Sequence, residues 1–156
     1  MRGILILYGY NVSMKSNILV FLQFFIILLM VIPIGAPSDT VEIGLAVFGF
    51  GAVIGLLALL KNELGNFNIR PDIKEDCTLI TTGIYAYIRH PMYTSVLIMM
   101  SSMTVIYPEK AEYLLYSILV VVLLLKMFYE ESLWKCESEE YREYTKSTKR
   151  IIPFIF

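Results

Sequence analysis

Apolar residues along this chain gather into four long stretches separated by polar segments. The stretches cover residues 18–34, 43–60, 91–107 and 113–129, and each holds 17 or 18 residues. An α-helix rises about 1.5 Å per residue, so this length is close to the shortest that crosses a hydrocarbon core of roughly 30 Å. The pattern therefore predicts four transmembrane helices, each extended by flanking residues. The third stretch is the most polar, and a re-entrant hairpin is the alternative there.

The composition agrees with a membrane location. Residues of the set AVILMFWYC make up 57% of the 156 residues, charged residues make up 17%, and the mean hydropathy is +0.66. Soluble domains have about 45–50% apolar and about 25% charged residues, and one small core cannot hide the excess. We predict one domain over residues 1–156: an all-α integral membrane helical bundle with four transmembrane helices. A cytoplasmic linker is expected at 61–90 and a cytoplasmic tail with an amphipathic helix at 130–156.

The positively charged residues predict the orientation. Of the 13 lysines and arginines, all except Lys110 belong to the same side of the expected bundle, with Lys126 inside the fourth stretch near that end. Because cytoplasmic loops carry an excess of Lys and Arg, both termini and segment 61–90 are predicted to be cytoplasmic. A cleaved signal peptide is the alternative interpretation of the first stretch. Its apolar run is longer than a typical signal-peptide core, however, and Pro37 would follow just after the cleavage site.

Charge and cysteine content argue against several classes of protein. The net charge is −1, so no basic surface is available to attract nucleic acid. Cys77 and Cys136 are not at metal-ligand spacing, and the single histidine cannot complete a metal cluster. No metal site is expected, and both cysteines are predicted to be free thiols on the reducing side.

The second stretch contains a G-x-x-x-G pattern at Gly51-Ala52-Val53-Ile54-Gly55. Small residues at this spacing let two membrane helices approach closely. Packing within the monomer is the favoured interpretation, and a homodimer through this glycine-rich span is the alternative.

The polar segment before the third stretch ends in Arg89-His90-Pro91-Met92-Tyr93. Proline suits the first position of a helix, because its missing N–H would have no partner there. The helix would then start with free N–H groups and the positive end of its dipole beside Arg89 and His90, an arrangement that favours anions. The sequence thus predicts an anion-binding helix start at the membrane interface.

A pair of glutamates, Glu130-Glu131, follows the fourth stretch. Only residues 108–112 connect the third and fourth stretches, so these two must form an antiparallel hairpin. The glutamates should therefore lie beside the start of the third helix at the same membrane depth. Each residue alone could be an interfacial anchor, but ionisable groups at membrane depth are costly and tend to mark functional sites. The candidate site residues are Arg89, His90, Tyr93, Glu130 and Glu131.

The tail turns polar after Trp134. Leu133, Tyr141 and Tyr144 recur at near-helical spacing, which predicts an amphipathic helix on the membrane surface. The apolar end at 151–156 is expected to pack back onto the bundle or the interface. A solvated helix with an apolar end fits the pattern equally well.

In their order and spacing these motifs resemble those of the isoprenylcysteine carboxyl methyltransferase and phospholipid methyltransferase superfamily of integral membrane enzymes. The resemblance covers roughly residues 55–153 and depends on Gly83-Ile84-Tyr85, Arg89-His90-Pro91-Met92-Tyr93, Glu130-Glu131-Ser132-Leu133-Trp134, Tyr141-Arg142-Glu143-Tyr144 and Arg150-Ile151-Ile152-Pro153. Ile84 stands where the family usually has proline, and Thr94-Ser95 stand where a glycine is common. The resemblance implies S-adenosylmethionine bound at the cytoplasmic side, between the hairpin, the connecting segment and the tail.

The resemblance also implies roles for individual residues. The cofactor-binding set that it implies is Tyr85, Arg89, His90, Tyr93, Glu130 and Glu131, and the catalytic candidates are Glu131, Glu130, His90 and Arg89. The chemistry suits the cofactor, because a helix start with Arg89 and His90 fits its carboxylate and a glutamate fits its ammonium group. We hypothesise that Arg89 and His90 orient the cofactor, while Glu131 holds its amino group or acts near the acceptor. An amine acceptor would need a base, for which His90 or a glutamate is the candidate.

The predicted function is S-adenosylmethionine-dependent methyl transfer to a lipid or lipid-like acceptor, by carboxylate O-methylation or amine N-methylation. The expected partners are membrane lipids and a lipid or lipidated small-molecule substrate. One alternative is a nicotinamide-dependent membrane reductase of related fold. The other is a non-enzymatic four-helix transporter or scaffold that uses Lys126 and Glu130. Transporters place such sites near the bilayer midplane, whereas these charges gather at one interface.

Overall fold

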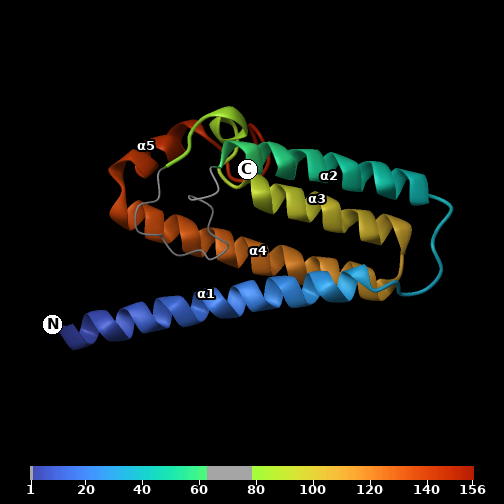
Figure 1. Cartoon of the computed structure of the whole chain (residues 1–156), viewed down its shortest axis with the longest axis horizontal. Coiled ribbons are helices and arrows are strands. Elements are labelled where there is room, and N and C mark those ends of the chain that lie inside the picture. The colour runs from blue at the N-terminus through green and yellow to red at the C-terminus, as the bar shows by residue number, and fades with distance from the viewer. Residues whose placement is uncertain (1, 63–78) are drawn as a thin grey trace.

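The computed structural model describes residues 2–62 and 79–156, and only the backbone at 2–13 and 137. Its helices are α1 (Arg2–Val31), α2 (Val41–Lys61), the short 3-10 helix η1 (Gly83–Ala86), α3 (Pro91–Ile106), α4 (Lys110–Glu137) and α5 (Glu139–Ser147). Helices α1 to α4 lie side by side with alternating direction, and α5 folds back at the end of α4 (Figure 1). Most of the expected linker 61–90, with Cys77, lies outside the described residues.

Four apolar helices form the membrane part of the described chain. Three of them are long and apolar enough to cross a membrane, over Met14–Val31, Val41–Lys61 and Lys110–Cys136. The remaining one, α3, is a shorter apolar helix. Because α3 is a continuous helix of 16 residues, the re-entrant alternative for this stretch is wrong. The prediction of an all-α membrane fold is confirmed.

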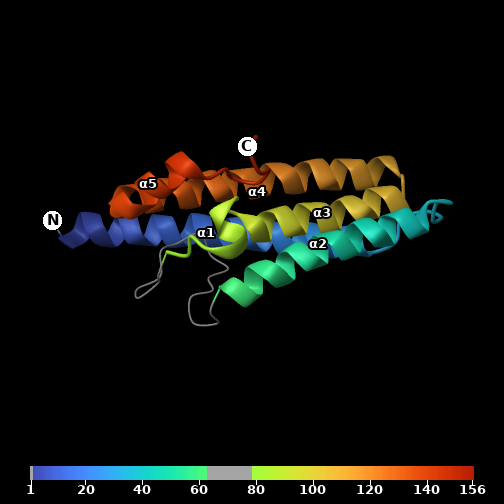
Figure 2. The same ribbon diagram turned by 90° about the horizontal axis from the view of Figure 1, so that it is seen from above.

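The order of the helices across the bundle is α2, α3, α4, α1. Helix α2 packs most extensively on α3, α1 packs mainly on α4, and α3 and α4 form a hairpin. Seen from above, α2 diverges from the other helices toward its C-terminal end (Figure 2). This order makes α3 and α4 the two helices that position the site.

The G-x-x-x-G glycines of α2 face α3. A Cβ atom on Gly51 would lie 2.8 Å from the backbone nitrogen of Met99, and one on Gly55 would lie 2.5 Å from Ser95 Oγ. The Ser95 hydroxyl donates to the Gly51 carbonyl across this contact, at 2.8 Å. The glycine pattern therefore serves close packing within the monomer, the interpretation favoured from the sequence.

Hydroxyl groups explain how the most polar stretch still forms a membrane helix. Ser101 donates to the Ile98 carbonyl at 2.7 Å, and Thr104 donates to the Ser101 carbonyl at 2.8 Å. A hydroxyl that returns to the backbone of its own helix is not left unsatisfied in an apolar environment. The serines and threonines of α3 thus add little cost to its burial.

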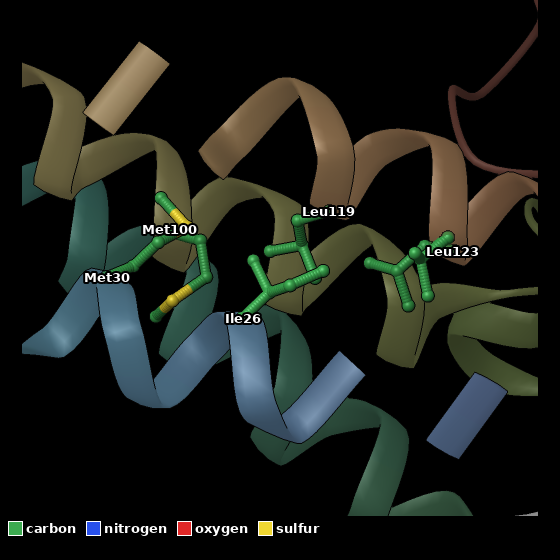
Figure 3. Close-up of a cluster of buried hydrophobic side chains, with 6 residues drawn as sticks. Ile26, Met30, Met100, Leu119 and Leu123 are labelled. Atoms are coloured by element: carbon green, nitrogen blue, oxygen red, sulfur yellow. The ribbon is translucent and has the colours of Figure 1, made fainter. Parts of the chain in front are cut away.

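The apolar core joins α1, α3 and α4 near the middle of the bundle. Ile26 and Met30 of α1 meet Met100 of α3 and Leu119 and Leu123 of α4 (Figure 3). Between membrane helices such contacts act through van der Waals packing, because lipid tails are as apolar as the side chains themselves. The outward sides of α1, α2 and α4 expose large apolar residues, including Phe21, Phe50, Leu60 and Val121. These surfaces suit contact with lipid.

Helix α4 continues beyond the apolar stretch and ends at Glu137. Glu130 and Glu131 are therefore helical, and their side chains are fixed by the same helix that spans the bundle. The following helix, α5, buries Tyr141 and Tyr144. These are two of the residues whose spacing predicted an amphipathic helix in the tail.

Candidate active site

A buried ion pair joins the start of α3 to the end of α4. Arg89 Nη2 lies 2.9 Å from Glu131 Oε1, and the side chains are 5% and 3% exposed. Arg89 Nε donates to the same oxygen at 3.0 Å. The antiparallel hairpin thus brings together two candidates that are 42 residues apart in the sequence.

Glu130 lies against the first turn of α3. The Tyr93 hydroxyl donates to Glu130 Oε2 at 2.8 Å, and His90 Nδ1 lies 3.8 Å from the same oxygen. The imidazole of His90 stacks on the Tyr93 ring, with 5.2 Å between their centroids. The Glu130 side chain is 28% exposed, so it is the more open of the two glutamates.

Glu131 is surrounded by cations of the chain itself. Besides its bond to Arg89, Arg150 Nε donates to Glu131 Oε2 at 3.2 Å, and Lys135 Nζ lies 3.4 Å from that oxygen. His90 Nε2 lies 3.5 Å from Glu131 Oε1. Both carboxylate oxygens of Glu131 are therefore engaged by side chains, whereas the hydrogen bond to Glu130 uses one oxygen.

The tail after α5 completes the surroundings of Arg89. Its Nη1 donates to the Thr148 carbonyl and to the Thr145 carbonyl at 3.4 Å. The backbone N–H groups of Arg89 and His90 donate to the carbonyls of Lys149 and Arg150 at 2.8 and 2.9 Å. The tail is thus held against the segment that leads into α3, and it fixes the direction of the Arg89 guanidinium.

Tyr85 and Tyr144 connect η1 to α5 beside this cluster. The Tyr144 hydroxyl donates to the Tyr85 carbonyl. Burial, with a contribution from the Glu130 carboxylate, raises the pKa of Tyr85 to about 12. Burial also raises the pKa of Tyr144 to about 12. Both tyrosines therefore stay neutral at physiological pH and remain hydrogen-bond donors.

A second polar contact, one turn deeper in the bundle, was missed in the sequence analysis. Lys126 is 1% exposed, its Nζ donates to Gln23 Oε1 at 2.7 Å, and Nζ lies 5.2 Å from the centroid of the Tyr93 ring. Each residue stands out in the sequence, because Lys126 is the only charge in the fourth stretch and Gln23 is a polar residue inside the first, but the sequence does not pair them. Arg150 was also missed as a site residue, although it begins one of the motifs of the tail.

Three groups at this site can face a ligand. Within the described part of the chain, His90 Nε2 is buried without a well-formed hydrogen bond, and its nearest carboxylate oxygen is Glu131 Oε1 at 3.5 Å. The first turn of α3, which starts with Pro91, has no side-chain cap. Glu130 adds a partly exposed carboxylate to the same region. A ligand with an amino-acid moiety, which carries one carboxylate and one ammonium group, therefore matches the groups that these residues offer.

Comparison with known families identifies the chain. A model of the phospholipid methyltransferase family matches residues 40–136, which is more than half of the sequence. The chain belongs to the phospholipid methyltransferase family. The matched region of this phospholipid methyltransferase family member contains α2, α3 and α4, and it includes Arg89, His90, Glu130 and Glu131.

A solved structure shares the fold. It is described as the eukaryotic intramembrane Ras methyltransferase ICMT, an isoprenylcysteine carboxyl methyltransferase, solved without a monobody. The identity is 22% and the TM-score 0.60, over 95% of this chain and 53% of the other. The family member described here thus spans about half the length of that enzyme. No curated protein matches the chain.

Proposed function

We propose that this family member transfers a methyl group from S-adenosylmethionine to a lipid or lipid-like acceptor at the membrane interface. The observation that carries the proposal is the meeting of the α3 start with Glu130 and Glu131 inside the region that matches the family. Methyl transfer is a displacement at carbon, so catalysis depends mainly on holding the reactants in line. When bound, the cofactor supplies the activated methyl group.

The contacts favour a division of labour between the two glutamates. Glu131 already contacts three cations of the chain, whereas Glu130 is more exposed and accepts a hydrogen bond from a tyrosine hydroxyl on one oxygen. We therefore assign the cofactor ammonium to Glu130, and its carboxylate to the N–H groups in the first turn of α3. Arg89 and Glu131 become positioning residues. This assignment replaces the hypothesis from sequence that Glu131 holds the amino group.

The acceptor determines whether a base is needed. A carboxylate acceptor is already nucleophilic, whereas an amine acceptor must lose a proton before or during the transfer. His90 is the candidate base, because Nε2 has no hydrogen-bond partner among the described residues and Nδ1 lies 3.8 Å from Glu130. The exposed apolar surfaces of the neighbouring helices favour an acceptor that reaches the site from the lipid.

The sidedness and assembly of the protein belong to the same proposal. We place the site and both termini in the cytoplasm, since most lysines and arginines flank this end of the bundle. A homodimer through α2 would use its outward side, where a Cβ on Gly49 meets no atom within 4 Å. Gly51 and Gly55 are occupied by α3.

The first test measures transfer and binding together. Purified protein in nanodiscs is given S-adenosylmethionine with a labelled methyl group and a total lipid extract, and we expect the label to enter the lipid fraction. Replacing Glu130 with Gln removes a charge-assisted hydrogen bond of about 1.5–3 kcal/mol, so cofactor affinity by calorimetry should fall roughly tenfold to a hundredfold. Glu139→Gln is the matched control, because Glu139 pairs with Arg142 on the exposed surface.

One outcome would contradict the role of Glu130, and another would contradict the function itself. If Glu130→Gln and Glu139→Gln bind the cofactor equally well, Glu130 does not hold the ammonium group. If no methyl label enters lipid but hydride from a labelled nicotinamide cofactor does, the site belongs to a reductase. In that case the arrangement of charges would serve a different cofactor.

A further inference from the structure

The chain ends in a closed turn, residues 151–156, which we call the C-terminal hook. The N–H groups of Ile151 and Ile152 donate to the Phe156 carbonyl at 2.7 and 2.8 Å, and the Phe156 N–H donates to the Ile152 carbonyl at 3.1 Å. Phe154, at the tip, has φ 67°. The hook therefore has a defined shape of its own and does not depend on α5 for its backbone hydrogen bonds.

Ile151, the first residue of the hook, is buried, but the apolar side chains that follow it are exposed. Phe154 is 82% exposed and Ile155 is 75% exposed, and Ile152 and Phe156 are exposed as well. A cluster of large apolar residues at the end of a fixed turn is unfavourable in water and indicates a surface that is covered. Packing back onto the bundle, one of the two expectations from the sequence, does not account for the two residues at the tip.

The hook continues the lipid-facing surface of α4. The Arg150 guanidinium lies between two aromatic rings, 5.3 Å from the centroid of Phe128 and 5.3 Å from that of Phe156. Phe128 belongs to the membrane span Lys110–Cys136 and is itself exposed. The Arg150 guanidinium thus connects the hook to Phe128, a residue that faces lipid. Lys149, exposed just before it, suits the anionic headgroups of a membrane surface.

The hook is also anchored to the site. The Thr94 hydroxyl of α3 donates to the Ile151 carbonyl at 3.0 Å, and Arg150 Nε donates to Glu131 at 3.2 Å. The position of the hook is therefore fixed relative to the start of α3. Phe156 is an aromatic partner of Arg150, and Arg150 pairs with Glu131. A surface that holds Phe156 in place therefore also helps to hold Arg150 on Glu131.

We infer that the C-terminal hook inserts Phe154 and Ile155 into the lipid at the site end of the bundle. The hook there acts as a membrane anchor that keeps Arg150 on Glu131. Aromatic and aliphatic side chains beside basic residues are the combination that binds the headgroup and acyl-chain boundary of a bilayer. The lipid, and not a second copy of the chain, is the occupant, because the hook is continuous with the lipid-facing side of α4.

The test measures the depth of the hook directly. In a background with Cys77 and Cys136 replaced by serine, single cysteines are introduced as Ile155→Cys and, as control, Lys146→Cys. Lys146 lies on the exposed side of α5, with its side chain 70% exposed. Each is labelled with a small fluorophore in nanodiscs holding one copy of the chain. We expect lipid-borne nitroxide to quench the label at 155 several-fold more than at 146, and aqueous iodide to show the reverse.

The opposite results would overturn the inference. Equal iodide quenching at both positions would place the hook in water. Protection at 155 that appears only with two copies in a disc would assign the surface to a second chain. This measurement does not depend on catalysis, so it separates the anchor from the proposed methyl transfer.

A second variant tests the link to the site and rests on the proposed function. Phe154→Asn with Ile155→Ser removes the apolar tip, and asparagine tolerates the positive φ at position 154. We expect lower methyl transfer in nanodiscs, whereas the control Phe154→Leu with Ile155→Leu should keep transfer near that of the unchanged chain. Unchanged transfer in the Asn–Ser variant would show that the hook does not support the site.

Discussion

The two ends of the α3–α4 hairpin are held in different ways. At the far end the loop before α2 covers the last carbonyls of α3: Ser38 N–H donates to Ile106 at 2.8 Å, and the Ser38 hydroxyl donates to Val105 at 2.8 Å. At the site end the corresponding connections are charged, with Arg89 and Glu131 at 2.9 Å. The neutral contacts at the far end join α3 to the loop before α2, whereas the charged contacts at the site end join the start of α3 to α4.

This difference supports the proposal that the site end of the hairpin carries the chemistry. The last carbonyls of any helix need partners, and neutral donors such as Ser38 supply them at little cost. A buried ion pair has a desolvation cost that its attraction barely repays, so it is poor evidence of a stabilising role. The charges at the site end exceed what closing the hairpin requires, which supports a functional purpose for Arg89 and Glu131.

One residue departs from this contrast. Glu112, in the first turn of α4 at the far end, is 0% exposed, and within the described chain neither carboxylate oxygen has a hydrogen-bond partner. Among the described groups, the positive end of the α4 dipole favours its charge. The far end therefore carries one buried acid without the cations that surround Glu131 at the site end.

The largest effect is expected from breaking the ion pair at the site end. Arg89→Met removes a buried partner of Glu131 and the donor to the Thr148 carbonyl, and should lower the free energy of unfolding by about 3 kcal/mol. Cofactor affinity should also be lost, because the Arg89 side chain no longer connects the start of α3 to the tail. Unfolding in detergent by SDS titration and calorimetry with S-adenosylmethionine measure the two effects.

Leu119→Ala is the matched control for that variant. Leu119 is 0% exposed in the core, away from the charged cluster, and its truncation should cost about 2–5 kcal/mol. Cofactor affinity of the folded fraction should nevertheless stay unchanged. If Arg89→Met and Leu119→Ala lose affinity to the same extent, the effect at Arg89 reflects general instability and not the site.

An intermediate effect of opposite sign is expected at the far end. Glu112→Met keeps a similar volume and removes an unpartnered buried carboxylate, which should raise the free energy of unfolding by about 1 kcal/mol after the loss of the dipole interaction. SDS titration checks the sign, and Glu109→Gln, at an exposed position just before α4, is the control. A destabilised Glu112→Met would mean that this acid has a partner or role at the far end comparable to Glu131.

The smallest effect is expected from the tyrosines beside the site. The folded state raises the pKa of Tyr144 from 10.0 to about 12, so the unfolded chain loses this proton first as the pH rises. The stability that depends on the neutral tyrosine is complete below pH 10 and is lost as the pH rises through about 12. Tyr144→Phe should cost about 1 kcal/mol at neutral pH and reduce the alkaline loss. An identical alkaline profile in Tyr144→Phe, followed by circular dichroism, would assign the loss to other groups.

The sequence predicted the membrane helices and the members of the site with different success. Long apolar stretches and a connection of only a few residues were sufficient for the α3–α4 hairpin, because a short connection leaves the two helices no other arrangement. The meeting of Arg89 with Glu131 followed from the same constraint. The partner of Lys126 did not follow, since nothing local relates it to Gln23, which lies 103 residues earlier.

The roles of the two glutamates required the tertiary structure. Glu130 and Glu131 are adjacent and chemically identical in the sequence, but a helix turns by about 100° per residue and sends them to different neighbours. One meets Tyr93, and the other meets Arg89 and Arg150. The tail that supplies Arg150 is held against the start of α3 by backbone hydrogen bonds. Almost any residue type can form such bonds, so the sequence does not reveal them.

By itself the sequence determined that the chain is a helical membrane protein with one charged end. The length of each apolar stretch and the positions of the charged residues can be read directly along the chain. Only the tertiary structure decided which charges neutralise each other and which stay available. That decision depends on distances of a few ångström between α1, α4, α3 and the tail. Ionic and hydrogen-bond energies fall steeply over such distances, and no spacing along the chain specifies them.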